Sequence, residues 1–556
     1  MRIFEKYTGS DFEDYYDFKK NFRINAPENF NYGFDILDEL ANEKPDKLAM
    51  IWIGISGEEK RFTFGDFKKM SNRAANFFTR IGIKKGDMVM LILKRRYEFW
   101  VSMLALHKIG AIAVPATHLL TKKDIVYRNN YGDISTIICV DEGEIADHVE
   151  AAEPESATLK RKILVKGKRD GWYSFDEETE NESEVFERPT GENETKLKDP
   201  MLMFFTSGTT GMPKMVLHNN SYPLAHIQTA VFWHNVDPEG IHFTVSDSGW
   251  GKCLWGKFYG QWAAETAVFV YEFDKFDPKA MLETISKYRI TTFCAPPTIY
   301  RYFIKEDLKS YDLSALKYAT TAGEALNPEV FDQFKAATGI DIKEAFGQTE
   351  TTAILGNWIC MKGQKGSLGR PSPLYKVDIV DNDGVPCPPG EPGEIIVYTD
   401  RQVPYGLFLG YYKDEELTKQ AWDKGMYHTG DLAWRDERGY YWYVGRKDDV
   451  IKSSGYRIGP FEVESALMEH PAVLETSITG VPHPERGQVV KATIVLAKGY
   501  EPSDALIKEL QDHVKKATAP YKYPRVIEFV DELPKTISGK IKRFEIRKRD
   551  QEKYGK

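Results

Sequence analysis

The chain has 556 residues, beyond the size at which one hydrophobic core stops growing, so two or more domains are expected. Hydrophobic residues make up 42% and charged residues 28%, which excludes a fibrous or disordered protein. The 83 acidic and 75 basic side chains are scattered and leave a net charge of -8, which argues against nucleic acid or an anionic membrane as the main partner.

The cysteines and the N-terminus indicate a reducing compartment. The five cysteines are odd in number and far apart, so neither a disulfide framework nor a zinc site is predicted. The first 22 residues hold no apolar signal core and are too acidic for a mitochondrial transit helix. No run of eighteen apolar residues occurs. A cytoplasmic protein is predicted; its oligomeric state stays open.

Strand-like and helix-like segments alternate through the first two thirds of the chain. From Asp87 the strand DMVMLIL is followed by an amphipathic helix from Tyr97 to His107 and by the strands AIAVP and STIICV. The pattern returns at HFTVSD, TAVFVY, ITTFCAPP and LKYATTAG. This predicts an α/β protein with parallel, helix-covered sheets, whose ligands bind at the carboxyl ends of the strands.

The pattern of predicted secondary structure changes twice toward the C-terminus. From about Gly366 short strands and turns predict an antiparallel β subdomain, and after Arg446 a helix at 461–470, the strand VVKATIVLA and a second helix predict a small α+β domain. We place the boundary so that the large domain is 1–447 and the small, mobile domain is 448–556. The acidic stretch 177–187 is interpreted as a surface loop or insertion.

The string TSGTTGMPK follows the apolar run MLMFF and combines small hydroxyls, glycines and one lysine. Backbone N–H groups, hydroxyls and an ammonium in such a loop can surround phosphate oxygens. The spacing does not fit a Walker A loop. Its composition alone would favour a flexible turn. The residues proposed to contact phosphate are Thr206, Ser207, Gly208, Thr209, Thr210, Gly211 and Lys214.

This string resembles the signature of the adenylate-forming superfamily, and further matches follow in the order of that family. They are TAGEAL (321–326), EAFGQTE (344–350), YHTGD (427–431), YVGRKDDVIKSSGYRIGP (443–460) and PKTISGK (534–540). The strings SDSGW, SSGYRIGPFEVESALMEHPAV and APYKYPR are most similar to AMP-forming medium-chain acyl-CoA synthetases. The resemblance covers nearly the whole chain and is weakest before about Phe34. It implies formation of an acyl-CoA from a carboxylic acid, ATP and CoA through an acyl-adenylate.

The resemblance also implies roles for single residues. Glu350 is expected to hold Mg²⁺, since a hard cation prefers carboxylate oxygen near the phosphates. Asp431 is expected to accept the ribose hydroxyls, and Arg446 to pair with ribose or phosphate oxygens. The residues expected around adenine are Gly323, Glu324, Ala325, Glu344, Ala345, Phe346, Gly347, Gln348 and Thr349, with the ring at 346 stacked on the base.

Lys540 is expected to bridge the substrate carboxylate and the α-phosphate during adenylation. Thioester formation then needs a rotation of the small domain about a hinge at Asp448, because the lysine and the pantetheine of CoA cannot occupy one place. The residues carried over as CoA contacts are Ser454, Gly455, Tyr456, Arg457, Arg486, Tyr523, Pro524 and Arg525.

The acyl pocket is less clearly encoded. Gly347 stands where acetyl-CoA synthetases carry a tryptophan, which favours a chain longer than acetate. The bulky residues expected to line the pocket are Trp233, Trp250, Lys252, Trp255 and Cys294, and they favour a short, broad cavity for propionate, butyrate, isobutyrate or 2-methylbutyrate. Residues 255, 258, 259 and 262 follow helical spacing and predict one core-facing stripe. Lys252 is interpreted as reaching solvent or as held to guide the carboxylate.

Other functions fit parts of this pattern. An aryl-acid CoA ligase stays open, whereas an adenylation enzyme serving a carrier protein fits SDSGW and YKYPR less well. A non-catalytic nucleotide or acyl-CoA sensor is disfavoured because Glu350, Asp431, Arg446 and Lys540 are all present. A luciferase-type oxygenase shares the first half-reaction and is separated only by its product.

Overall fold

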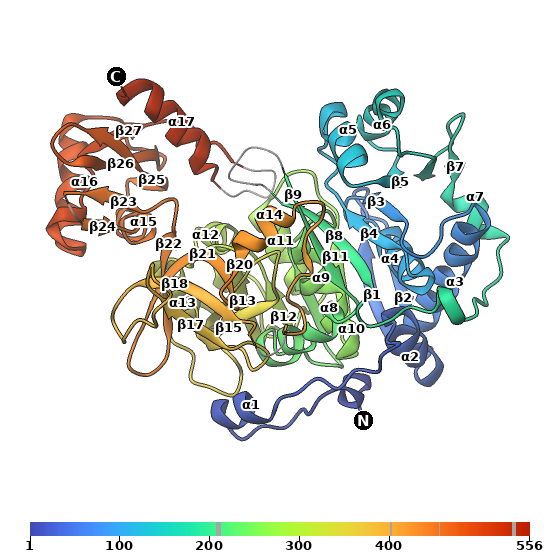
Figure 1. Cartoon of the computed structure of the whole chain (residues 1–556). Coiled ribbons are helices and arrows are strands. Elements are labelled where there is room, and N and C mark those ends of the chain that lie inside the picture. Colours follow the sequence, from blue (N-terminus) through green and yellow to red (C-terminus); the bar gives the residue numbers. More distant parts are fainter. Residues whose placement is uncertain (207–212, 401–402, 455, 536–540, 556) are drawn as a thin grey trace.

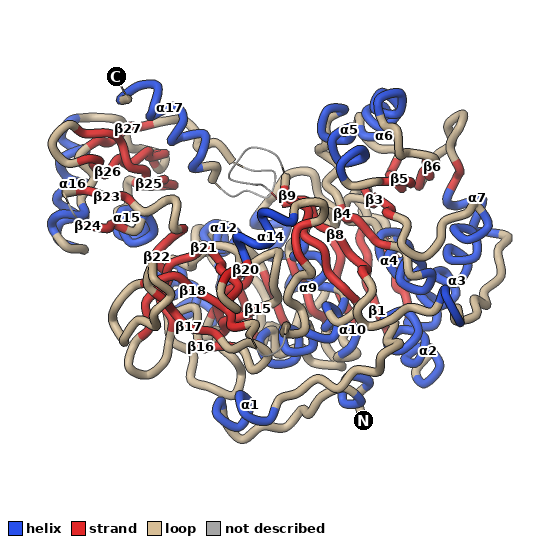
Figure 2. The backbone as a smooth tube through the Cα atoms, viewed as in Figure 1, coloured by secondary structure: helices blue, strands red, loops and turns tan. Residues whose placement is uncertain are grey.

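The computed structural model describes residues 1–206, 213–400, 403–454, 456–535 and 541–555. Within these ranges the strands form four sheets, two of them mostly parallel. The chain has a large N-terminal part and a smaller C-terminal part, with helices packed on the parallel sheets (Figure 1; Figure 2). The predicted α/β fold is therefore confirmed.

The nine-stranded sheet contains the strands whose carboxyl ends were expected to bind a ligand. Its inner strands pair in parallel, and antiparallel strands close both edges. The order is β16 (Arg370–Pro371), β15 (Ala353–Gly356), β14 (Ile342–Gly347), β13 (Tyr318–Ala322), β12 (Thr292–Cys294), β10 (Ile241–Thr244), β11 (Ala267–Tyr271), β1 (Leu48–Ile53) and β2 (Glu59–Thr63).

The second large sheet is parallel except where β9 pairs with β8 and β19. Its order is β19 (Gly410–Tyr411), β9 (Lys214–Asn219), β8 (Pro200–Thr206), β4 (Ile112–Pro115), β3 (Met88–Ile92), β5 (Ile134–Val140), β6 (Arg161–Val165) and β7 (Tyr173–Ser174). The Thr206 to Lys214 string thus joins two antiparallel neighbours.

Short helices connect or cover these strands. They are α1 (Tyr15–Asn21), α2 (Glu39–Glu43), α3 (Phe64–Arg80), α4 (Glu98–Ile109), α5 (Lys122–Tyr131), α6 (Ile145–Ala152), α7 (Phe175–Glu180), α8 (Tyr222–Ala225), α9 (Gly251–Lys257), α10 (Tyr259–Ala263), α11 (Pro278–Lys287), α12 (Pro297–Phe303), α13 (Pro328–Thr338) and α14 (Glu415–Ala421), together with the π-helix η5 (Gln228–Trp233).

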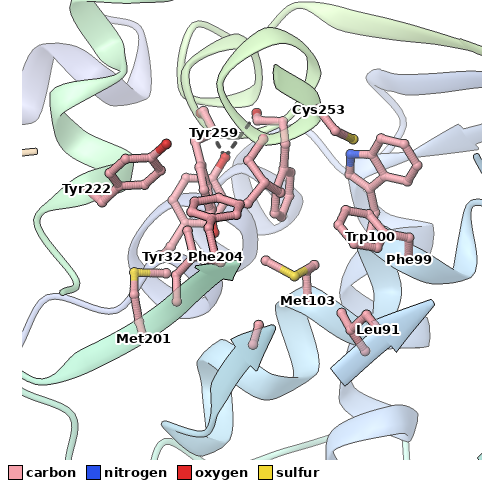
Figure 3. Packing of buried hydrophobic residues seen from close by; sticks show 14 of the residues in the cluster. Tyr32, Leu91, Phe99, Trp100, Met103, Met201, Phe204, Tyr222, Cys253 and Tyr259 are labelled. Atoms are coloured by element: carbon pink, nitrogen blue, oxygen red, sulfur yellow. Dashed lines mark hydrogen bonds between the residues drawn. The ribbon is translucent and has the colours of Figure 1, made fainter. Parts of the chain in front are cut away.

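One buried cluster contains residues of both large sheets and of the helices packed on them. Trp100 and Met103 of α4, Leu91 of β3 and Phe204 of β8 are buried there, close to Tyr259 of α10 (Figure 3). The helix predicted at 97–107 is present as α4, but it is buried along its entire length, so its predicted amphipathic character is wrong. Its charged residues are tolerated because they are paired: Arg96 donates to Glu98 at 2.6 Å, and Lys108 donates to Asp38 at 2.7 Å.

The predicted continuous helix through residues 255–262 is also wrong. The backbone breaks at Phe258, with φ -147° and ψ -86°, and separates α9 from α10. The side chain of Gln261 closes the break: its Oε1 accepts the Phe258 N–H at 3.1 Å, and its Nε2 donates to the Trp255 carbonyl at 3.1 Å. Phe258, Tyr259 and Trp262 are core residues, whereas Trp255 is only half-buried.

The antiparallel β subdomain is confirmed as the sheet β17 (Val377–Val380), β18 (Gly393–Tyr398), β21 (Met426–Arg435) and β20 (Trp422–Asp423), with β22 (Tyr441–Arg446) on β21. The small α+β region contains β23 (Ile451–Ser453), β24 (Tyr456–Ile458), β25 (Val473–His483), β26 (Gly487–Leu496) and β27 (Val526–Phe529), with α15 (Pro460–Met468), α16 (Asp504–Ala517) and α17 (Arg543–Tyr554).

The acidic stretch 177–187 is not a plain loop, since it begins within α7. Its carboxylates hold α3: Arg80 contacts Glu178 at 2.7 Å and Glu182 at 2.6 Å. Among the described residues, no helix is long and apolar enough to span a bilayer.

Candidate active site

The two ends of the predicted phosphate loop lie side by side, because Thr206 ends β8 and Lys214 begins β9 directly opposite. Lys214 Nζ lies 5.2 Å from the ring centroid of Tyr411. Ser207, Gly208, Thr209, Thr210 and Gly211 lie outside the described residues.

Glu350 lies against the same tyrosine. The Tyr411 hydroxyl donates to Glu350 Oε1 at 2.8 Å, and the Glu350 carbonyl accepts the Phe408 N–H at 2.8 Å. Tyr411 is buried on β19, opposite Val216 of β9. Burial and the neighbouring carboxylate raise the pKa of the Tyr411 phenol, so it stays a hydrogen-bond donor. Tyr411 therefore links Lys214 to Glu350.

Asp431 is the centre of a dense polar network. Its Oδ1 accepts the Tyr443 hydroxyl at 2.9 Å, and its Oδ2 accepts Arg446 Nη1 at 3.0 Å and Gln348 Nε2 at 2.5 Å. Gln348 in turn accepts the Tyr427 hydroxyl at 2.7 Å. Burial raises the pKa of Asp431 despite the opposing effect of Arg446. We call Gln348, Glu350, Asp431, Tyr443 and Arg446 the nucleotide side.

Next to Asp431, the buried Glu394 orders the backbone of β21. Its Oε1 accepts the Gly430 N–H at 3.0 Å and its Oε2 accepts Lys447 Nζ at 3.0 Å. Burial alone would raise the pKa of Glu394, but His428, Lys447 and the Gly430 N–H lower it to about 2. This carboxylate had no motif to mark it.

The adenine candidates lie at the carboxyl ends of β13 and β14. Gly323 has φ +102°, a backbone conformation that favours glycine, and begins the turn after β13. Glu344 holds this turn by accepting the Leu326 N–H at 2.9 Å. Burial raises the pKa of Glu344 to about 8, against the opposing effect of that hydrogen bond. The carboxylate of Glu324 lies 3.7 Å from Arg301.

The other residues of the 344–350 string make packing or backbone contacts. The ring of Phe346 lies 6.3 Å from that of Tyr443, and Ala345 is buried in β14. Thr349 accepts His218 Nε2 through its carbonyl at 2.7 Å. A Cβ on Gly347 would lie 2.3 Å from the Thr352 carbonyl oxygen. The backbone at 347 thus excludes any side chain unless it moves, which the comparison with tryptophan at this position did not foresee.

Trp233, Lys252 and Trp255 are linked by contacts with one another and with β13 and β14. The ring centroids of Trp233 and Trp255 are 5.9 Å apart, and Trp233 Nε1 donates to the Lys343 carbonyl at 3.2 Å. Lys252 Nζ donates to the Ala322 carbonyl at 2.8 Å and lies 5.6 Å from the Trp255 ring centroid. The buried Cys294 pairs with Thr320, on the strand that ends at Ala322, and burial raises the pKa of its thiol.

His234 joins this group: its ring centroid lies 4.4 Å from that of Trp233 and 5.8 Å from that of Trp255. Gln261 Nε2 donates to its Nδ1 at 2.9 Å. Burial lowers the pKa of His234 well below its ordinary value, so the ring stays neutral. We call Trp233, His234, Lys252 and Trp255 the acyl wall.

None of the described ring contacts joins Trp250 to the acyl wall. Trp250 lines a cavity of about 250 Å³ whose other walls include Lys94, Thr117, His118, Asp247 and Glu272.

The hinge and CoA candidates belong to the C-terminal part. The Asp448 carbonyl accepts Arg547 Nη1 of α17 at 2.8 Å. Arg486 Nη1 donates to Ser454 Oγ at 3.2 Å, and Tyr456 stacks on Tyr521 with ring centroids 4.1 Å apart. Four further candidates are also described: Arg457 is exposed, Arg525 donates to the Tyr523 hydroxyl, and the Pro524 carbonyl accepts Gln511. Gly455 and Lys540 lie outside the described residues.

Sequence reasoning missed Tyr411, Tyr443, Gln261 and Glu394. Tyr443 stands inside a quoted motif, three residues before Arg446, so its position was a usable signal. Tyr411 and Glu394 contact the site only because β19 and β18 bring them there.

Family models match two regions of the chain. Residues 37–412 match the AMP-binding enzyme family, and residues 462–540 match the AMP-binding enzyme C-terminal domain. Curated relatives include the mitochondrial acyl-coenzyme A synthetase ACSM3 of Pongo abelii, 42% identical over 98% of this chain and 93% of the relative. The mitochondrial acyl-coenzyme A synthetase ACSM5 of Homo sapiens is 42% identical over 94% of this chain and 91% of the relative.

Solved structures of CoA ligases and of an acyl-CoA synthetase are also similar to this chain. The anthranilate CoA ligase AuaEII in complex with anthranoyl-AMP superposes with a TM-score of 0.87 at 29% identity, covering 96% of this chain and 99% of that one. An acyl-CoA synthetase of Brucella canis gives a TM-score of 0.72 at 32% identity, covering 94% and 95%. The benzoate CoA ligase from Burkholderia xenovorans LB400 gives 0.81 at 26% identity, covering 93% and 100%.

Proposed function

The chain belongs to the AMP-binding enzyme family and is an AMP-forming acyl-CoA synthetase, and we propose that its acid is a short to medium fatty acid. Propionate, butyrate, isobutyrate and 2-methylbutyrate are the substrates that fit best. The observation that carries this proposal is the contact between Trp233 and Trp255 beside β14. Two indoles there fill volume that a long acyl chain would need.

ATP and CoA are its co-substrates. A carboxylate cannot expel oxide, so the acid is first joined to AMP as a mixed anhydride. Asp431 binds the ribose hydroxyls through the lone pairs left on its oxygens, while Tyr443, Gln348 and Arg446 hold the carboxylate in place. Lys214 and Arg446 supply positive charge toward the phosphates.

We propose Glu350 as the protein ligand of Mg²⁺. The described partner of its carboxylate is a neutral phenol rather than a cation. No group of three or more His, Cys, Asp or Glu that could hold a metal occurs in the described ranges, so Glu350 would share the ion with phosphates and water. When bound, the ion supplies charge neutralisation for the phosphates.

An acid panel tests the proposed substrate. Acids from C2 to C10, isobutyrate, 2-methylbutyrate and benzoate should be compared by kcat/KM in CoA-dependent AMP formation. We expect the maximum among the C3 to C5 acids. A maximum on unbranched C8 or longer would contradict the proposal, and a maximum on benzoate would favour the aryl-acid alternative, which the likeness to two aryl-acid CoA ligases keeps in view.

Lys540 is proposed to serve adenylation alone. The variant Lys540→Ala should lose acid-dependent ATP–pyrophosphate exchange but still form thioester from supplied acyl-AMP and CoA. Lys542→Ala is the matched control, because that lysine pairs with Glu545 at 2.8 Å. Equal loss of both half-reactions in Lys540→Ala would contradict this role.

The domain boundary and the CoA contacts are proposals of the same kind. The pairing of β22 with β21 ends at Arg446 and β23 begins at Ile451, which supports domains of 1–447 and 448–556 with Asp448 as hinge. Exposed Tyr456 and Arg457 beside Arg486 support a CoA-binding face on the small domain.

A cytoplasmic location is also proposed, and cell fractionation would test it.

A further inference from the structure

The N-terminal segment lies along the lower edge of the molecule (Figure 1). The family model begins only at residue 37. Yet residues 12–22, which we call the strap, bury Phe18 and Phe22 completely or nearly so, and Asp14 caps α1 by accepting the N–H groups of Tyr16 and Asp17. A segment folded and buried in this way has a definite position.

The strap packs on η5, the helix that carries Trp233 of the acyl wall. Phe12, Phe18 and Phe22 surround the single ring of Phe232, with centroids at 5.5, 4.6 and 5.6 Å. Phe232 precedes Trp233 in η5. The outer face of this helix is therefore covered by the strap, while Trp233 contacts Trp255 and β14.

The strap also reaches the other end of η5 through polar contacts. Lys19 Nζ donates to the Tyr375 carbonyl at 2.8 Å and to the Ser372 carbonyl. The Ser372 hydroxyl donates to Gln228 Oε1, at the first residue of η5, and Gln228 Nε2 donates to the Ala353 carbonyl at 3.1 Å. Both ends of η5 are thus connected to the strap.

η5 needs such support more than an ordinary helix does. It is a π-helix, a form that is rare and that tertiary contacts must maintain. Its last residue places an indole in the acyl wall, and a small displacement there changes the room for a methylene group.

We propose that the strap is a positioning element for the acid: by holding η5 through Phe232 and Gln228 it fixes Trp233 and so determines which acids are accepted. This inference rests on the proposed role of Trp233 in the acyl wall. Phe18 and Lys19 are positioning residues, since they act through η5.

The test compares Phe18→Ala with Phe18→Leu, and with Phe30→Ala as matched control. Phe30 is also fully buried and lies in the N-terminal segment, but it is outside the strap and packs on Tyr7, with ring centroids 5.5 Å apart. For each variant we would measure kcat and KM for propionate, butyrate, hexanoate and octanoate, KM for ATP, and Tm.

We expect Phe18→Ala to raise the hexanoate-to-propionate ratio of kcat/KM about five- to ten-fold, since a methylene group in a pocket is worth at least that much. The change should appear in KM for the acid, with KM for ATP unchanged. Phe18→Leu should restore most of the original ratio, and Phe30→Ala should lower Tm without changing the ratio.

If Phe18→Ala does not fold, Lys19→Met makes the same test through Gln228. An unchanged ratio in folded Phe18→Ala or Lys19→Met would overturn the proposal, as would an equal shift in Phe30→Ala. The wild-type acid panel tests the proposed substrate independently of the strap. A wild-type maximum at C8 would contradict the short-acid proposal, but the change in the hexanoate-to-propionate ratio between variant and wild type would still test the strap.

Discussion

The nucleotide side and the acyl wall are built by different interactions. Asp431 is held by a phenol, an amide and a guanidinium, each donating to a particular oxygen. Trp233 is held mainly by ring contacts with His234 and Trp255, and by the strap behind η5. Hydrogen bonds demand definite residue types, whereas packing accepts any set of rings that fills the space. The nucleotide side should therefore fail on small chemical changes, and the acyl wall on changes of shape.

The largest loss is expected for Asp431→Asn, which keeps the shape but removes the charge that faces Arg446. The variant loses charge-assisted hydrogen bonds, to Arg446 and to the proposed ribose hydroxyls, worth about 1.5 to 3 kcal/mol each, so kcat/KM for ATP should fall roughly 100-fold. Steady-state kinetics with saturating acid would measure it. Asp423→Asn, at an exposed carboxylate, is the control. A loss specific to long acids would break the contrast between the two sides.

Gly347→Ala tests the position where the two sides meet. Because the added Cβ would lie 2.3 Å from the Thr352 carbonyl, we expect about 2 kcal/mol lower stability and a similar loss of activity with every acid. Gly251→Ala is the control, since its Cβ would have only ordinary contacts at 3.7 Å. Denaturant unfolding would measure the loss of stability, and the acid panel would measure the loss of activity. Selective loss of long acids would instead favour direct contact between residue 347 and the acyl chain.

Tyr411→Phe removes one hydroxyl from Glu350 and leaves the ring beside Lys214. Losing this hydrogen bond should cost about 1 kcal/mol, or roughly five-fold in pyrophosphate exchange, with a weaker apparent affinity for Mg²⁺. Tyr412→Phe is the neighbouring control, because that hydroxyl contacts Asp133. Equal effects in the two variants would show that Tyr411 does not orient Glu350.

The smallest effect on activity is expected at Glu344, which is tested instead through the pH dependence of stability. The folded-state pKa of Glu344 is raised from 4.5 to about 8, so its contribution to stability is full below about pH 4.5 and decreases as the pH rises toward 8. Glu344→Gln should flatten that part of the Tm profile while still accepting the Leu326 N–H. Glu391→Gln, in an exposed turn, is the control. Parallel profiles for Glu344→Gln and wild type would contradict the assignment.

Short strings singled out residues that the fold brings together. Glu350, Asp431, Arg446 and Gln348 all occur in motifs, and the structure brings Gln348, Asp431 and Arg446 into hydrogen-bond contact. The α/β alternation and the later β subdomain were also readable, because strands buried on both faces leave long apolar runs. Periodicity failed at α4, where pairing of charges allows full burial, and at Phe258, where one glutamine side chain stabilises a break.

By itself, the sequence determined the fold class, the family and the chemistry, since these depend on residue types at fixed spacings along one segment. Tertiary structure alone decided which residues meet in the proposed acyl wall. Trp233 meets Trp255, Lys343 and, through Phe232, the strap, and these residues come from distant parts of the chain. Their contacts depend on the shape of the assembled core, which no local pattern encodes.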